Sequence, residues 1–146
     1  MDDTVPKRGW VDVTEGEFKG WQVWPADRWE MHAGPFYTRR EADGSVRCAF
    51  RLEPKHMNSQ GSMHGGAMMA FADYLAFALT DPKEKEGTVT VSLNSEFVRG
   101  AAIGDLIEAT GEVVKAGRRL VFTRGALSTS GQTIMSFSAV LMRTPG

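Results

Sequence analysis

Cysteine is nearly absent from this sequence: its 146 residues contain one, Cys48. A lone cysteine cannot form an internal disulfide, which favours a reducing compartment. We interpret Cys48 as a core thiol, because no second residue at the spacing of a nucleophile's partner or a metal ligand accompanies it. The N-terminal residues are acidic and carry no apolar segment of the secretory type. Together these features predict a cytoplasmic protein.

Net positive charge and long apolar runs are also lacking. The formal net charge is −1, so no overall basic field is present to attract nucleic acid or an anionic membrane. The most apolar stretch, residues 65–79, is interrupted by Asp73 and falls short of the roughly 18–20 residues that a membrane span needs. We therefore expect neither nucleic acid nor membrane as a partner.

Several catalytic and ligand-binding motifs are missing as well. Ser62 lies in Gln-Gly-Ser-Met-His, which is not the nucleophile motif of serine hydrolases. The histidines His32, His56 and His64 do not have metal-ligand spacing, and there is no phosphate-binding G-x-x-x-x-G-K. The sequence thus predicts a protein without a resident metal or cofactor.

The length predicts one domain with a preceding arm. We assign residues 1–29 to an N-terminal arm and residues 30–146 to the domain. The arm contains Trp10, Trp21, Trp24 and Trp29, so we expect parts of it to dock on the domain. Residues 14–18 have the pattern of a short helix.

Strand patterns occur on both sides of one helical stretch. Residues 35–40 and 46–52 are joined by Asp43-Gly44, a strong hairpin signal. Apolar and polar residues then alternate over residues 89–97, as they do in a half-buried strand. Three further strands are expected at residues 106–114, 119–128 and 133–143, with Ala116-Gly117 and Ser130-Gly131 as turns.

The segment 64–79 predicts a long helix. It is rich in Ala, Met, Leu and Phe and has no β-branched residue. Because it is apolar nearly all round, we expect it to lie inside the protein, and Asp81-Pro82 should end it. Two strands, one buried helix and four strands predict an α+β architecture. An antiparallel sheet of about five or six strands wrapped around one central helix is the arrangement of the hotdog fold.

Asp73 is the only charged residue in this helix. Burial would raise the pKa of its carboxyl, and a carboxylate of raised basicity in an apolar site suits a general base or a nucleophile. The alternative is a structural aspartate that is hydrogen-bonded to the backbone or to Tyr74.

The start of the helix offers hydrogen-bond donors. His64-Gly65-Gly66 opens it, and the first N–H groups of a helix have no helical partner. Glycine allows a ligand oxygen to approach them, so an oxyanion would be stabilised there. The alternative is that the glycines only permit tight packing. Asn58 could supply a second donor through its side-chain amide, or it could be a turn residue.

Spacing along the helix bears on how these groups combine. Gly65 and Asp73 are eight residues apart, which places their backbones ~12 Å apart on one helix. A short aspartate side chain does not cover that distance. If both residues act on one substrate, they come from different subunits of a two-fold dimer.

Residues 58–66, followed by Asp73, resemble the hotdog-fold thioesterases of the phenylacetate-pathway type. The family pattern N-x-x-G-x-x-H-G-G, with six residues before an aspartate, is complete in this sequence. The resemblance extends from about residue 34 to residue 142 and leaves the arm unmatched. It implies an acyl-CoA thioesterase, which hydrolyses a thioester to a free acid and CoA.

The resemblance also implies roles for individual residues. Asp73 would activate water or attack the thioester directly. The N–H of Gly65, helped by Asn58, would hold the carbonyl oxygen. His64 would support the loop or lie near the thioester sulfur, and Thr90 occupies the position of a hydroxyl residue near the nucleophilic water.

CoA is the carrier that the resemblance implies, as part of the substrate. Relatives place a basic turn like Lys115-Ala116-Gly117-Arg118 beside the nucleotide, whereas the plain alternative is a solvated hairpin end. Phe97 would line the path of the pantetheine, or it is an ordinary core residue. The resemblance further implies dimers that assemble into tetramers.

Two other functions stay open at this point. An acyl-CoA hydratase or dehydratase on the same fold pairs a helix carboxylate with a histidine, which His64 would supply. Such an enzyme leaves the thioester intact, whereas a thioesterase releases a free thiol. The other alternative is a non-catalytic acyl-CoA-binding protein. Such proteins usually carry a DNA-binding segment, for which the first ~29 residues are too short.

Overall fold

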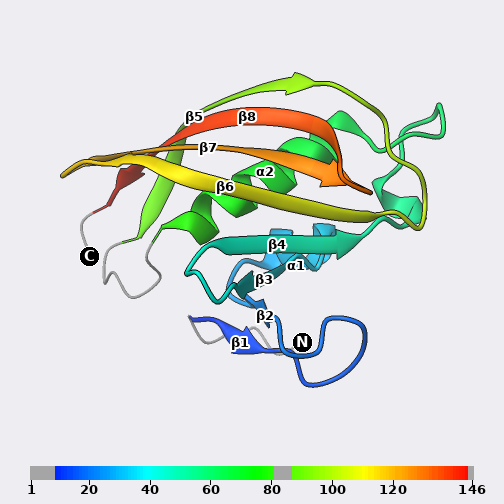
Figure 1. The fold of residues 1–146 in the computed structure, drawn as a ribbon, viewed down its shortest axis with the longest axis horizontal. Coiled ribbons are helices and arrows are strands. Elements are labelled where there is room, and N and C mark those ends of the chain that lie inside the picture. The colour runs from blue at the N-terminus through cyan, green and yellow to red at the C-terminus, as the bar shows by residue number, and fades with distance from the viewer. Residues whose placement is uncertain (1–8, 81–86, 145–146) are drawn as a thin grey trace.

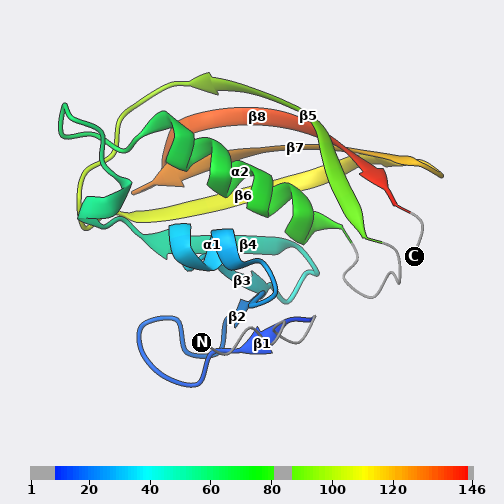
Figure 2. The same cartoon turned by 180° about the vertical axis from the view of Figure 1, so that it is seen from behind.

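One long helix, α2 (Gly65–Leu79), lies along the concave face of an antiparallel sheet, as Figures 1 and 2 show from opposite sides. This computed structural model describes residues 9–80 and 87–144. The strand order is β1-β2-β3-β4-β6-β7-β8-β5. The predicted α+β hotdog architecture is confirmed, with eight strands where five or six were expected.

Six of the strands match the six predicted ones. They are β3 (Tyr37–Arg40), β4 (Val46–Arg51), β5 (Thr88–Phe97), β6 (Leu106–Ala116), β7 (Leu120–Thr129) and β8 (Gln132–Arg143). β3 pairs with β4 across the Asp43-Gly44 turn, where Gly44 has a φ of +87°. Ser130 and Gly131 both have positive φ, as the tight turn between β7 and β8 requires.

Alternating side chains fix which face of the sheet meets the helix. On β8, Met135, Phe137 and Leu141 are buried, whereas Ser138 between them is exposed. The helix contributes the fully buried Phe71 to the same core. Each such apolar side chain contributes about 1.5–3 kcal/mol when it is removed from water, so this face fixes the register of the sheet on the helix.

Both ends of α2 are capped by side chains. His64 is the N-cap, and its Nδ1 accepts a hydrogen bond of 2.8 Å from the Gly66 N–H. At the other end, the Thr80 hydroxyl donates to the Phe77 carbonyl at 2.7 Å. The predicted stop at Asp81-Pro82 lies outside the described residues.

The sheet covers only part of the helix surface. Met69 is 38% exposed, Gly66 is exposed, and Ala70 and Asp73 are half-buried. The expectation that α2 is enclosed on all sides is therefore wrong for the single chain, because one curved sheet reaches only one side of a helix. The open strip carries Asp73 at its centre.

The arm adds two short strands and a helix: β1 (Val11–Asp12), β2 (Gln22–Val23) and α1 (Arg28–Ala33). The expected helix at residues 14–18 is wrong. These residues form a bend between β1 and β2, in which Gly16 has a φ of +84°. Phe18 stacks on Tyr37 at a centroid distance of 4.1 Å, so burial of one ring overrides the local helix pattern.

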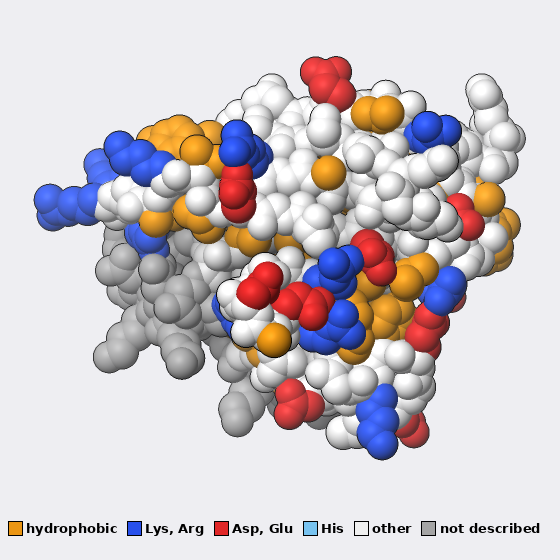
Figure 3. Space-filling model, in the orientation of Figure 1, with side chains coloured by type: hydrophobic (Ala, Val, Ile, Leu, Met, Phe, Trp, Pro, Cys, Tyr) orange, Lys and Arg blue, Asp and Glu red, His pale blue; other side chains and the backbone are white. Residues whose placement is uncertain are grey.

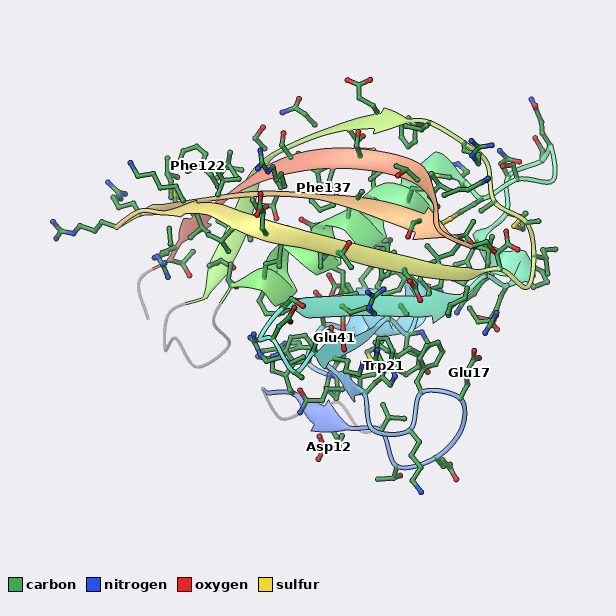
Figure 4. The ribbon with its side chains drawn as sticks, viewed as in Figure 1. Asp12, Glu17, Trp21, Glu41, Phe122 and Phe137 are labelled. Carbon is green, nitrogen blue, oxygen red and sulfur yellow. The ribbon has the colours of Figure 1, made fainter. Side chains whose placement is uncertain are left out.

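Three of the four arm tryptophans dock, as predicted. Trp10 packs edge-on against Trp24 at a centroid distance of 5.1 Å. The Arg39 guanidinium lies 4.5 Å from the ring centre of Trp21, which is labelled in Figure 4. Trp29, on α1, is 63% exposed. The predicted boundary between residues 29 and 30 falls inside α1 and stays a prediction. Within residues 9–80 and 87–144, no helix combines the length and apolar character needed to cross a membrane.

Candidate active site

Asp73 and Thr90 meet between α2 and the edge strand β5. The Thr90 hydroxyl donates a hydrogen bond of 2.5 Å to Asp73 Oδ1. A β-bulge interrupts the pairing of β5 with β8 between Thr90 and Ser92, and bulges re-aim the side chains next to them. The structure thus brings together two residues that are 17 positions apart. The hydroxyl fixes one carboxylate oxygen and leaves the other available.

Tyr74 is not a hydrogen-bond partner of Asp73. Tyr74 points into the core, where its hydroxyl pairs with Thr38 at 2.7 Å and donates to the Phe36 carbonyl at 3.2 Å. Burial raises the pKa of this phenol. Cys48 contacts the same Thr38 hydroxyl at 3.4 Å, and burial raises the pKa of its thiol to about 12. Cys48 is therefore a core thiol, as predicted.

The first turn of α2 presents a backbone donor. The Gly65 N–H has no hydrogen-bond partner within residues 9–80 and 87–144. A Cβ placed on Gly65 would lie 3.2 Å from a ring carbon of Phe97, so this ring lies against the glycine. Phe97 is 56% exposed and is therefore not an ordinary core residue.

Asn58 lies in the loop that leads into α2. Its Oδ1 accepts hydrogen bonds from the N–H groups of Gln60 at 2.9 Å and Ser62 at 3.0 Å. This pattern confirms that Asn58 is a turn residue. Because Oδ1 is occupied in the loop, the side-chain Nδ2 points away from these two donors and is left as a donor of its own.

Within one chain, the aspartate and the glycine donor do not converge. α2 is a continuous helix from Gly65 to Leu79, so the ~12 Å separation expected from the helical rise applies. A single chain carries the carboxylate–hydroxyl pair at one place and the N–H donor at another.

The basic turn lies at the other end of the sheet from the start of α2. Lys115, Gly117 and Arg118 are at the β6–β7 hairpin, which the Gly117 N–H closes by donating to the Leu120 carbonyl at 2.8 Å. In Figure 1 this hairpin and the start of α2 lie at opposite ends of the sheet. Figure 3 shows cationic side chains around exposed apolar ones at the hairpin end of the sheet. Val114, on β6 in this hairpin, is 55% exposed.

Glu30, on α1, was not among the predicted site residues. Its pKa is raised to about 8, first by burial and then by the negative charges of Asp27 and Asp73. The contribution of Asp73 places α1 beside the candidate carboxylate. No local sequence pattern indicated this, because Glu30 lies on α1, a six-residue helix at the border of the arm and the domain whose docking depends on tertiary contacts.

We predict that Glu30 makes the stability of the protein depend on pH. Between its unfolded pKa of 4.5 and its folded pKa of about 8, the folded state holds a proton that the unfolded state has released. Stability therefore falls as the pH rises through this window. The unmodified protein should lose unfolding free energy between pH 5 and pH 8. Glu30→Gln should lose less over the same range, by on the order of 3 kcal/mol.

Denaturant titrations at both pH values measure this difference. Glu15→Gln is the matched control, because Glu15 is an exposed glutamate of the same arm. We expect this control to have the pH dependence of the unmodified protein. The same pH dependence in Glu30→Gln would contradict the assignment.

Comparison with known proteins agrees with this architecture. A family model described as "Thioesterase superfamily" matches residues 60–136. A Pseudomonas aeruginosa protein named as a candidate esterase is 34% identical over 109 residues, which cover 73% of this chain and 81% of that protein. Human acyl-coenzyme A thioesterase 13 is 32% identical over 83 residues, 56% of this chain and 59% of the human protein.

Solved structures share the fold. The PaaI protein from the phenylacetic acid degradation operon of E. coli superimposes with a TM-score of 0.72 at 19% identity, covering 80% of this chain and 84% of PaaI. Zebrafish thioesterase superfamily member 2 gives a TM-score of 0.67 at 27% identity, covering 75% of this chain and 81% of the fish protein. The chain therefore belongs to the thioesterase superfamily and is a thioester hydrolase with a hotdog fold.

Proposed function

We propose that the protein hydrolyses acyl-CoA thioesters at a site shared by two subunits. The observation that carries this proposal is the separation, along one helix, of the Asp73–Thr90 pair from the unpartnered Gly65 N–H. The match to an acyl-coenzyme A thioesterase supports the substrate class. A hypothetical Streptococcus pneumoniae thioesterase crystallised with coenzyme A shares the fold, with a TM-score of 0.70.

The open edge of the sheet supports a dimer. β5 pairs with β8 on one side only, and its ten residues are at the end of the strand order. Exposed edges of this length are normally covered. Val89 and Val91 on this strand are 45% and 52% exposed, and Met69 on α2 is 38% exposed. We propose that a second copy pairs along β5 and covers the open strip of α2, and that such dimers assemble further into tetramers.

In the proposed reaction, Asp73 of one subunit accepts a proton from water while the water oxygen attacks the thioester carbonyl carbon. The Gly65 N–H and the Asn58 amide of the other subunit hold the resulting oxyanion. Collapse breaks the C–S bond, and the leaving thiolate takes up the proton that Asp73 accepted from water. Because His64 Nδ1 accepts from the Gly66 N–H, the Nε2–H of His64 is free to donate a hydrogen bond to the sulfur as it leaves. Direct attack by Asp73, which would form an anhydride that water then opens, is the alternative route.

The remaining predicted residues would hold CoA. The exposed Phe97 ring beside Gly65 suits the pantetheine. A two-fold axis through β5 would exchange the two ends of the sheet, so Lys115, Gly117 and Arg118 of one subunit would approach the start of α2 in the other. Water and side chains supply all the groups that the reaction needs, so we propose no resident cofactor. The cytoplasmic location stays a prediction.

The test is a thiol-release assay across straight-chain acyl-CoA substrates, with analysis of the products. We expect equal amounts of free CoA and free acid. A product that keeps its thioester but gains or loses water would indicate a hydratase or dehydratase. Binding without any turnover would indicate a non-catalytic acyl-CoA-binding protein.

A further inference from the structure

A cavity of about 390 Å³ lies between α1 of the arm and the first half of α2. Its α2 side is formed by the small residues Gly66, Ala67 and Ala70. Because these side chains end at Cβ or lack it, they leave depth for a ligand. Trp29 and Phe36 supply aromatic walls. The volume lies within the roughly 300–1,000 Å³ typical of small-molecule sites.

Of the lysine and histidine side chains that line this cavity, Lys55 and His56 already have partners, and His32 and His64 are the other two. The Lys55 ammonium donates to the carbonyls of His32 at 2.9 Å and Gly34 at 2.8 Å. His56 accepts from the Glu53 N–H through Nδ1 at 2.9 Å and contacts the Ala33 carbonyl through Nε2 at 2.7 Å. Because Lys55 and His56 are satisfied, the surface of the cavity consists mainly of carbon atoms. Such a surface favours an uncharged apolar group as ligand.

The same contacts hold α1 in place. The carbonyls at the end of a helix lack helical partners, and here Lys55 and His56 reach those of His32, Ala33 and Gly34. Both side chains come from the short 3₁₀ helix η1 (Pro54–His56). The wall that carries Trp29 is thus anchored to the loop that leads into α2.

The cavity is next to the proposed oxyanion donor. His64 and Gly66 both line it, and Gly65 between them lies against Phe97. A thioester whose oxygen is held by the Gly65 N–H therefore has a largely apolar cavity on one side and an exposed aromatic ring on the other. The acyl part fits the cavity, and the carrier fits the open side.

We propose that this cavity receives the acyl group and that Trp29 and Ala70 limit the size of that group to a compact, uncharged hydrocarbon chain of medium length. This inference rests on the proposed thioesterase function. It also gives the arm a role in substrate selection, since Trp29 comes from α1.

The test compares kcat/KM for acetyl-, hexanoyl- and dodecanoyl-CoA. Ala70→Leu fills the cavity, so it should lower the value for hexanoyl-CoA at least about tenfold relative to acetyl-CoA. Trp29→Ala opens the wall, so it should raise the ratio of dodecanoyl-CoA to hexanoyl-CoA by about tenfold. Trp29 is exposed, so we expect Trp29→Ala to keep the core intact. The test therefore stands on this variant even if Ala70→Leu does not fold.

Trp21→Ala is the matched control, because Trp21 is an arm tryptophan that packs against Arg39 and does not line the cavity. Its chain-length ratios should equal those of the unmodified enzyme. Unchanged ratios in Trp29→Ala would overturn the acyl assignment while the thioesterase function stands. Absence of thiol release from all three substrates in the unmodified protein would overturn the acyl assignment, and its absence from aryl-acyl-CoA substrates as well would overturn both.

Discussion

Asp73→Asn is expected to lower kcat for thiol release from acyl-CoA by about a thousandfold, within the range of general-base contributions. Asparagine has nearly the same shape, and its side-chain oxygen can still accept the 2.5 Å hydrogen bond from Thr90. It cannot take a proton from water or form an anhydride. The variant should therefore lose the chemical step and keep its fold.

Steady-state kinetics, thermal unfolding and CoA binding by calorimetry check this expectation together. Asp105→Asn is the matched control: Asp105 accepts a hydrogen bond from the Ala102 N–H at 2.9 Å, which asparagine can also do. Its kcat should stay within about twofold of the unmodified enzyme. Full activity in Asp73→Asn would remove this carboxylate from the reaction.

Mixing two inactive variants should restore activity if the site is shared. Gly65→Pro removes the backbone donor at the first helical position, where proline is tolerated. The preceding His64 has φ −63° and ψ 134°, which suits a residue before proline. A heterodimer of Gly65→Pro with Asp73→Asn contains one intact site and one doubly altered site. Random pairing predicts about a quarter of the unmodified activity.

Subunit exchange followed by a thiol-release assay measures this recovery, and differential tags confirm that heterodimers form. Gly65→Ala separates two effects, because it adds a Cβ near the Phe97 ring but keeps the N–H. We expect Gly65→Ala to retain more activity than Gly65→Pro. Confirmed heterodimers without recovered activity would show that each chain holds a complete site.

The sequence predicted best those elements whose signal is local. The absence of β-branched residues, together with His64-Gly65-Gly66 at its start, predicted a helix over residues 64–79. The observed α2 differs from it by one residue at its start. Asp43-Gly44 identified the β3–β4 hairpin because glycine is the residue that readily takes the φ of +87° observed there. Alternation of polar and apolar residues located the later strands.

The arm was predicted least well, because long-range packing decides its structure. Residues 14–18 have a helical pattern, yet the stack of Phe18 on Tyr37 holds them in a bend. α1 was missed because six residues give a weak periodic signal. Its position depends on hydrogen bonds from Lys55 and His56, more than twenty residues away.

The site shows the same division. The motif at residues 58–66 identified Asn58, His64 and Gly65, and the structure places them in one loop and helix start. The contact between Thr90 and Asp73 depends on a bulge in β5. No spacing rule anticipates such a bulge. The family resemblance named Thr90 as a site residue, but the contact with Asp73 was not predicted.

The two borders of the sheet differ in a way that limits how far chains can associate. One border ends in β1, a strand of two residues, which is too short to template another chain. The other border is the ten-residue β5. If a second copy pairs along β5 as proposed, no other long edge remains in the described part of the sheet, so edge-to-edge growth would stop at a pair and would not continue into a fibre.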